Sequence, residues 1–275
     1  MKDIRIAAVV FNSTVGNISS NLERMARRIK AAAAEGASLV CFPELNVTGY
    51  TTHRDIKKAA LQIPGPITRK LSHLAASENI VIMAGLAEKG KASENHDIFA
   101  SHLVVKPEGD LGVYRKLHIA PPETSVFKPG NGIPLFEACG LKFGIQLCYD
   151  AHFPELTTHM ALMGADLIFM PHASPRGTAQ EKHRSWMRHM PARAYDNGLF
   201  IVACNQVGEN GKGLRFPGNA VVIGPSGEVI DTALNGREEM MVIDLKAEDL
   251  DRVRNHRMRY FLPNRRPELY SLNLA

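Results

Sequence analysis

Three chemically reactive side chains each follow a short run of apolar, strand-forming residues. These side chains are Glu44, Lys116 and Cys148. In parallel α/β sheets the carboxyl ends of the strands meet at one edge, which is where ligands bind. We therefore expect the three side chains to share one site.

Their chemistry is complementary. A cysteine thiol must lose its proton to become a nucleophile, and the Glu44 carboxylate can act as the general base. A fixed lysine ammonium stabilises the oxyanion that forms when a thiolate attacks a carbonyl or nitrile carbon. Cys148 lies at a predicted strand-to-helix turn, so the backbone N–H of Tyr149 can act as a second oxyanion donor.

Each residue also has an ordinary structural interpretation. Most free cysteines are small buried hydrophobes, so Cys148 could belong to the core. Glu44 could cap a helix, and Lys116 could be a surface charge on a hairpin. Glutamate and lysine are mostly exposed, however, and here each adjoins an apolar run. The combination favours a shared site.

The elements that must position these residues alternate along the chain. Residues 4–11 and 38–42 read as buried strands on either side of a helix, and such a βαβ unit favours parallel pairing. A hairpin of residues 98–105 and 112–114 precedes Lys116. The run that ends at Cys148 is followed by predicted helices at residues 154–162 and 179–197 and predicted strands at 165–170 and 199–204. We predict a single α/β domain over residues 1–275, without repeats or linkers.

Composition excludes several classes of protein. The chain of 275 residues is 45% hydrophobic and 22% charged, as in ordinary soluble globular proteins. Its net charge of +5 comes without a nucleic-acid-binding motif, so no nucleic-acid partner is expected. No stretch reaches transmembrane length, and the first apolar run lacks a cleavage site, so we expect a cytoplasmic protein without a membrane partner. Neither the histidines nor the four cysteines have metal-ligand spacing, and no metal or other cofactor is expected.

The segments around the three residues also carry a family resemblance. The chain resembles the nitrilase (carbon–nitrogen hydrolase) superfamily, and within it the amidase-like branch. The matching segments are Phe42-Pro43-Glu44-Leu45 with Thr48-Gly49-Tyr50, Tyr114-Arg115-Lys116-Leu117-His118, Leu147-Cys148-Tyr149-Asp150 with Phe153-Pro154-Glu155-Leu156, and the closing Arg265-Arg266-Pro267-Glu268-Leu269-Tyr270.

This resemblance implies a four-layer αββα sandwich that pairs as a homodimer, with the tail at residues 250–275 docking on a partner subunit. It implies Glu44 as general base, Lys116 as oxyanion cation and Cys148 as nucleophile. A second glutamate, Glu123, is implied to orient the lysine and the substrate amide. The residues implied to contact the substrate are Tyr50, His152 and Ser174.

The chain departs from the family pattern near the implied substrate site. Many members have arginine where this chain has His152, and Ser174-Pro175-Arg176-Gly177 replaces a different family segment. Arginine would suit a carboxylate, whereas histidine binds one only when protonated. The replacement favours amides that lack a second acidic group.

The expected reaction is hydrolysis of a small amide or N-carbamoyl compound through a cysteine thioester. A nitrilase would use the same three residues on a nitrile carbon, and an N-acyltransferase would pass the acyl group to an amine. A non-catalytic metabolite-binding protein on the same fold is the alternative from another class, although such a protein has no need of all three residues.

Overall fold

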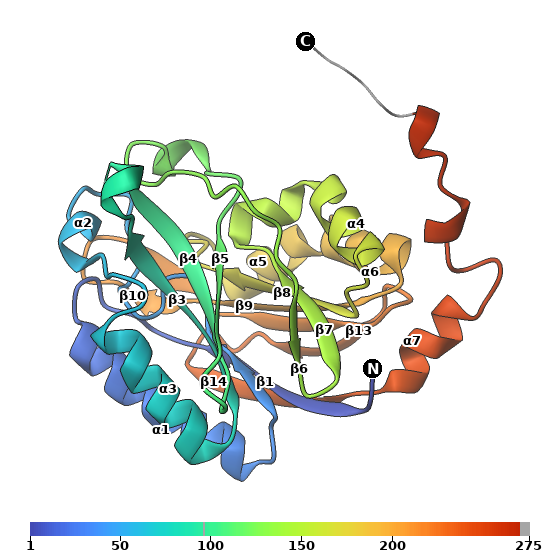
Figure 1. Ribbon diagram of the computed structural model, residues 1–275, viewed down its shortest axis with the longest axis horizontal. Coiled ribbons are helices and arrows are strands. Elements are labelled where there is room, and N and C mark those ends of the chain that lie inside the picture. The colour runs from blue at the N-terminus through green and yellow to red at the C-terminus, as the bar shows by residue number, and fades with distance from the viewer. Residues whose placement is uncertain (96, 270–275) are drawn as a thin grey trace.

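The computed structural model describes residues 1–95 and 97–269. Two six-stranded sheets pack face to face, and helices cover their outer faces (Figure 1). Helices α1 (Ile18–Ala34) and α3 (Pro66–Glu78) cover the first sheet. Helices α4 (Pro154–Leu162), α5 (Ala179–Trp186) and α6 (Met190–Asn197) lie over the second. The predicted αββα sandwich is confirmed.

The first sheet has the strand order β14-β1-β2-β3-β4-β5. Strands β1, β2 and β3 are parallel, whereas β4 is antiparallel to β3 and β5 is antiparallel to β4. Two antiparallel steps restore the direction, so β5 ends at the same edge as β2. The strands are β1 (Ile4–Val10), β2 (Leu39–Cys41), β3 (Val81–Lys89), β4 (Ile98–Val105), β5 (Leu111–Arg115) and β14 (Glu239–Leu245).

The second sheet has the order β13-β12-β9-β8-β7-β6, with β7, β8 and β9 parallel. Its strands are β6 (Phe136–Ala138), β7 (Leu141–Ile145), β8 (Leu167–His172), β9 (Phe200–Asn205), β12 (Ala220–Ile223) and β13 (Val229–Ala233). A separate two-stranded ribbon joins β10 (Val207–Glu209) to β11 (Arg215–Pro217). Short helical segments also occur between these elements: α2 (Ile56–Ala59), η1 (Ala92–Glu94), η2 (Pro121–Glu123) and η3 (Cys148–His152).

The apolar sequence of β1 follows from its burial on both faces. Ile6 and Ala8 belong to the core between the sheets, whereas the alternate residues Ala7 and Val9 pack in the core beneath α1 and α3. Successive strand side chains point to opposite faces. A strand covered on both sides therefore reads as a continuous apolar run rather than as alternation.

The prediction of one helix over residues 179–197 is wrong, because the structure has α5 and α6 there. Pro191 lies in the first turn of α6. Proline has no N–H for a helical hydrogen bond, and its ring clashes with the preceding turn, so a helix can begin but not continue through it. The apolar periodicity runs across the break and does not reveal it.

The C-terminal tail begins on the body of its own chain. Leu250 and Val253 of α7 (Ala247–Arg254) are buried, and Arg254 Nη1 lies 2.6 Å from Asp166 Oδ1. Beyond α7 the chain extends away from the sandwich through η4 (Leu262–Asn264) and η5 (Pro267–Leu269) (Figure 1). Residues 270–275 of the predicted docking tail, including Tyr270 of the closing motif, lie outside the described residues. In the described ranges, no helix combines the length and apolar character needed to cross a membrane.

Candidate active site

Three charged side chains are buried together where strand ends of the two sheets meet. Lys116 Nζ lies 2.8 Å from Glu44 Oε1, and 3.0 and 2.8 Å from the two carboxylate oxygens of Glu123. The side chains of Lys116 and Glu44 are fully buried, and Glu123 is 3% exposed. Buried charges require partners, and here one ammonium pairs with two carboxylates. The structure thus brings together three of the predicted residues.

The carboxylate of Glu44 is also held by the second sheet. The backbone N–H of Ala173, just after β8, donates to Glu44 Oε2 at 3.0 Å. Gln206, just after β9, donates through Nε2 to the Glu44 backbone carbonyl at 2.8 Å. Glu44 itself follows β2 of the first sheet. The first contact fixes the Glu44 carboxylate and the second fixes its backbone, and together they link the two sheets at the site.

Glu123 is positioned by the short helix η2 and by a phenol. Ala120 N donates to Glu123 Oε2 at 3.1 Å, and the buried Tyr50 hydroxyl donates to Oε1 at 2.8 Å. With the bonds from Lys116, both carboxylate oxygens accept two hydrogen bonds. Tyr50 was predicted to contact substrate, and its described contact is with Glu123.

Cys148 begins η3, in the turn that follows β7. Its φ of +45° places it in the left-handed region, which costs a residue other than glycine on the order of 1 kcal/mol. The residue is partly exposed, unlike the other members of the site. Strain of this kind is typical of a nucleophile that must stand clear of its sheet.

Asp150 ties this turn to the strand that delivers Lys116. Its Oδ2 accepts bonds from Leu147 N at 3.0 Å and from the Tyr114 hydroxyl at 2.7 Å. Its Oδ1 accepts a bond from His118 N at 2.8 Å. Tyr114 and His118 lie two residues before and after Lys116. Asp150 therefore sets the position of the turn that holds Cys148 relative to Lys116.

The charges of the site act on Cys148. Burial raises the pKa of the Cys148 thiol, and the Glu44 charge raises it further, while Lys116 lowers it. Burial also raises the pKa of Glu44 to about 7, against the opposing effect of Lys116. Burial opposes the charge on Lys116, but Glu44 and Glu123 outweigh it and raise the lysine pKa. Near neutral pH the site therefore has a thiol, an ammonium and a carboxyl group poised to exchange a proton.

Two of the remaining predicted residues lie in η3 together with Cys148, and the third, Ser174, follows β8. Tyr149 follows Cys148, and the exposed residue His152 ends η3 with its ring centroid 4.6 Å from that of His189. Burial lowers the pKa of His152, so it is neutral at pH 7. Ser174 Oγ accepts a hydrogen bond from Lys182 Nζ at 2.7 Å.

Sequence reasoning assigned no role to Ala173, Asp150 or Lys182. A backbone donor such as Ala173 can be any residue, so no sequence pattern marks it. Asp150 belongs to the Leu147-Cys148-Tyr149-Asp150 segment on which the family resemblance rests. Its position two residues after Cys148 was the signal that could have identified it. Lys182 lies within a predicted helix, where nothing local distinguishes it from a solvent-exposed lysine.

A sequence profile described as carbon-nitrogen hydrolase matches residues 5–255. The chain belongs to the carbon-nitrogen hydrolase family. It is 34% identical to a nitrilase of Pyrococcus abyssi over 97% of this chain and 99% of that protein. It is 30% identical to an N-carbamoylputrescine amidase of Solanum lycopersicum, over 99% of this chain and 95% of that one. The fold of this carbon-nitrogen hydrolase matches a variant of the amidase from Nesterenkonia sp. AN1 with a TM-score of 0.81 and 24% identity, covering 97% and 98% of the two chains.

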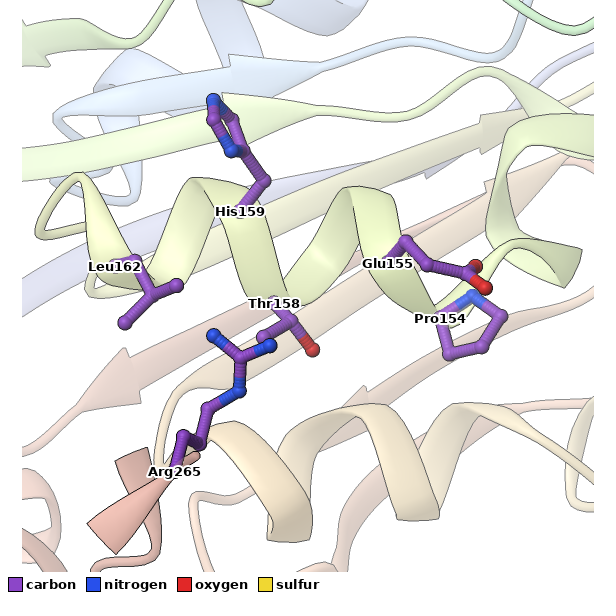
Figure 2. A pocket seen from close by; sticks show the side chains of 6 residues that line it. All are labelled: Pro154, Glu155, Thr158, His159, Leu162 and Arg265. Atoms are coloured by element: carbon purple, nitrogen blue, oxygen red, sulfur yellow. The ribbon is translucent and has the colours of Figure 1, made fainter. Parts of the chain in front are cut away.

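A separate hollow lies on the outer side of α4, where Arg265 of the tail approaches the helix (Figure 2). None of the predicted site residues of this carbon-nitrogen hydrolase lines it. Its lining residues are Pro154, Glu155, Thr158, His159, Leu162 and Arg265. This hollow belongs to the tail and α4 rather than to the chemistry around Cys148.

Proposed function

We propose that this carbon-nitrogen hydrolase cleaves a small amide or N-carbamoyl compound through a cysteine thioester and releases ammonia or an amine. The observation that carries the proposal is the buried Lys116 held between Glu44 and Glu123, with Cys148 at a strained turn within range of their charges. Such a set supplies a base, a nucleophile and an oxyanion partner.

The reaction begins when Glu44 accepts the proton of Cys148 Sγ and the thiolate attacks the carbonyl carbon. The resulting oxyanion accepts hydrogen bonds from the Lys116 ammonium and the Tyr149 N–H. Glu44 then gives its proton to the leaving nitrogen, the carbon–nitrogen bond breaks, and a thioester remains. Glu44 next deprotonates a water, which attacks the thioester carbon, and the acid leaves as Cys148 recovers its proton.

Glu123 takes a positioning role in this scheme. Its two oxygens hold Lys116, and Tyr50 and the Ala120 N–H fix its orientation. A carboxylate so placed can also accept a hydrogen bond from the substrate NH₂ group. Glu44, whose pKa is about 7, is the better proton carrier at neutral pH.

The relatives support an amide substrate. Proteins named N-carbamoylputrescine amidase and (R)-stereoselective amidase each share 30% identity with most of this chain. The amidase from Nesterenkonia sp. AN1 is described with acrylamide added to its active-site cysteine. A nitrilase activity is the second candidate, because the relative from Pyrococcus abyssi has that name. N-acyl transfer and non-catalytic metabolite binding have no such support.

Ammonia release from matched substrates separates these functions. We expect ammonia from a primary amide or an N-carbamoyl amine, and none from the corresponding nitrile. Ammonia from the nitrile alone would replace the proposal with nitrilase activity. If none of these compounds reacts and a small electrophile fails to label Cys148, a non-catalytic binding protein would be the better account.

The pH dependence of kcat/KM should follow Glu44. The carboxylate form of Glu44 accepts the thiol proton, and its pKa of about 7 means that this form is lost as the pH falls through about 7. We expect kcat/KM to fall about tenfold per pH unit below that point. Steady-state rates across the pH range test this, with circular dichroism at each pH to exclude unfolding. An inflection at about 4.5, the ordinary value for glutamate, would contradict the assignment.

We further propose that a second copy of the chain covers the face formed by α4, α6 and the tail, with residues 250–275 docking across the pair. Several large apolar side chains are exposed on these elements, and the ring centroids of Tyr195 and Phe261 lie 5.4 Å apart. The exposed residues are Leu162, Met163, Tyr195, Met258, Phe261 and Leu269. Exposed large apolar side chains gathered on neighbouring elements favour protein association.

Substitution of Leu162 by aspartate tests this pairing. Leu162 is 52% exposed at the end of α4, so the change should leave the fold intact but place a charge in the proposed interface. We expect a homodimer by light scattering for the wild-type chain and a monomer for Leu162→Asp. Lys70→Asp, on α3 at the opposite outer face, is the matched control and should remain dimeric. A monomeric wild-type chain would rule out this arrangement.

A further inference from the structure

The ammonium of Lys182 lies near Cys148, and the proposed mechanism does not use it. From α5 its Nζ donates to Ser174 Oγ at 2.7 Å and to the Pro175 carbonyl at 3.2 Å. The side chain is partly buried, and its positive charge lowers the pKa of the Cys148 thiol. The ammonium therefore lies within electrostatic range of the reacting sulfur.

The segment that holds Lys182 is fixed to the catalytic cluster. Ser174 directly follows Ala173, whose N–H donates to the Glu44 carboxylate. Asn205 holds the Ser174 backbone from both sides, accepting a bond from its N–H at 3.0 Å and donating to its carbonyl at 3.1 Å. Lys182 therefore contacts one end of a fixed segment, and the other end of that segment is hydrogen-bonded to the Glu44 carboxylate.

This ammonium is not neutralised by the protein. Lys116 is paired with two carboxylates, but no carboxylate within residues 1–95 and 97–269 forms an ion pair with Lys182. Burial lowers the pKa of Lys182, and an approaching anion would oppose that effect. An ammonium that is partly desolvated and lacks a counter-ion can bind an anionic ligand group without first breaking a salt bridge.

The aromatic residues nearby supply no competing charge. Burial lowers the pKa of His172 to about 3 and that of His189 to about 4, and it also lowers the pKa of His152. These three imidazoles are neutral at pH 7. Arg193 is another cation in this region, and its Nη2 donates to the His152 carbonyl at 3.4 Å.

We propose that Lys182 binds a carboxylate at the end of the acyl chain of the substrate, so that the preferred amides carry a second, anionic group. This inference rests on the proposed amide hydrolysis at Cys148. It reverses the preference for amides without an acidic group that His152 alone suggested. The carboxylate would replace the Pro175 carbonyl as partner of Nζ and leave Ser174 Oγ in place.

The test compares two amides of the same shape, succinamate and butyramide, which differ by a carboxylate in place of a methyl group. We expect wild-type kcat/KM to be higher for succinamate. In Lys182→Met the ratio of the two kcat/KM values should fall by about 10- to 100-fold, mostly through KM, the size expected for one charge-assisted hydrogen bond. Lys182→Arg should restore part of the ratio. Arg184→Met, an exposed cation two residues along α5, should leave it unchanged.

A binding measurement separates this inference from the proposed reaction. Calorimetry on Cys148→Ala, which cannot form a thioester, should show tighter binding of succinamate than of butyramide, and Lys182→Met in that background should abolish the difference. If neither amide is hydrolysed but this binding preference is present, the reaction is wrong and the anion site stands. Equal losses for both amides in Lys182→Met would assign Lys182 a structural role and overturn the proposal. The proposal would also be overturned if the preference for succinamate were lost in Arg193→Met but kept in Lys182→Met.

Discussion

Replacing Cys148 with alanine should abolish amide hydrolysis while leaving the protein folded. Removal of the nucleophile eliminates the thioester route, so we expect kcat to fall by at least about 10⁴-fold, as in other enzymes that lose an attacking side chain. The substitution removes one sulfur atom from a partly exposed position, so the thermal midpoint should change little. Ammonia release under single-turnover conditions measures the loss of activity, and thermal unfolding followed by circular dichroism measures the midpoint.

Cys139 offers the matched control. It is the exposed free cysteine of the described chain, and it lies between β6 and β7, before β7 begins, whereas Cys148 follows the end of β7. Cys139→Ala should keep the wild-type rate, and a small electrophile should still inactivate it by labelling Cys148. Retention of most of the activity in Cys148→Ala would eliminate the thioester mechanism.

Replacing Lys116 with methionine should reduce both activity and stability. The substitution removes the cation that is proposed to hold the oxyanion, a loss that typically lowers kcat by about 10²- to 10³-fold. It also leaves Glu44 and Glu123 facing each other without a counter-ion in a buried site. Breaking a buried ion pair from one side costs about 3–5 kcal/mol of unfolding free energy. Urea unfolding and ammonia release measure the two effects.

A double variant separates stability from catalysis. Glu123→Gln in the Lys116→Met background removes one of the two facing carboxylates, so part of the lost unfolding free energy should return. Activity should not return with it, because the oxyanion cation is still absent. If the double variant recovered its rate together with its stability, the lysine would be structural rather than catalytic.

Much of this site was accessible from the sequence because its residues stand at strand ends. Glu44, Lys116 and Cys148 each follow an apolar run, and the structure places each after a strand. The positions at strand ends do not by themselves show which sheet each strand joins, however. Lys116 reaches the shared edge through two antiparallel steps, and Cys148 comes from the other sheet. Local sequence patterns do not encode which sheet a strand joins.

Other features of the site depend on contacts between distant segments. The family resemblance implied a role for Glu123, but its bonds to Lys116 and Tyr50 emerge only in the folded chain. Lys182 looked like any helical lysine until the structure showed its contact with Ser174. The break before α6 was missed because apolar periodicity continues across it, although Pro191 was the available signal.

The most direct test of the mechanism is mass spectrometry of the protein quenched during turnover of a primary amide. We predict an added mass equal to the acyl group of the substrate, located on Cys148 by peptide fragmentation and absent from the Cys148→Ala variant. Turnover without any acyl adduct on Cys148, or with the adduct on another residue, would contradict the account.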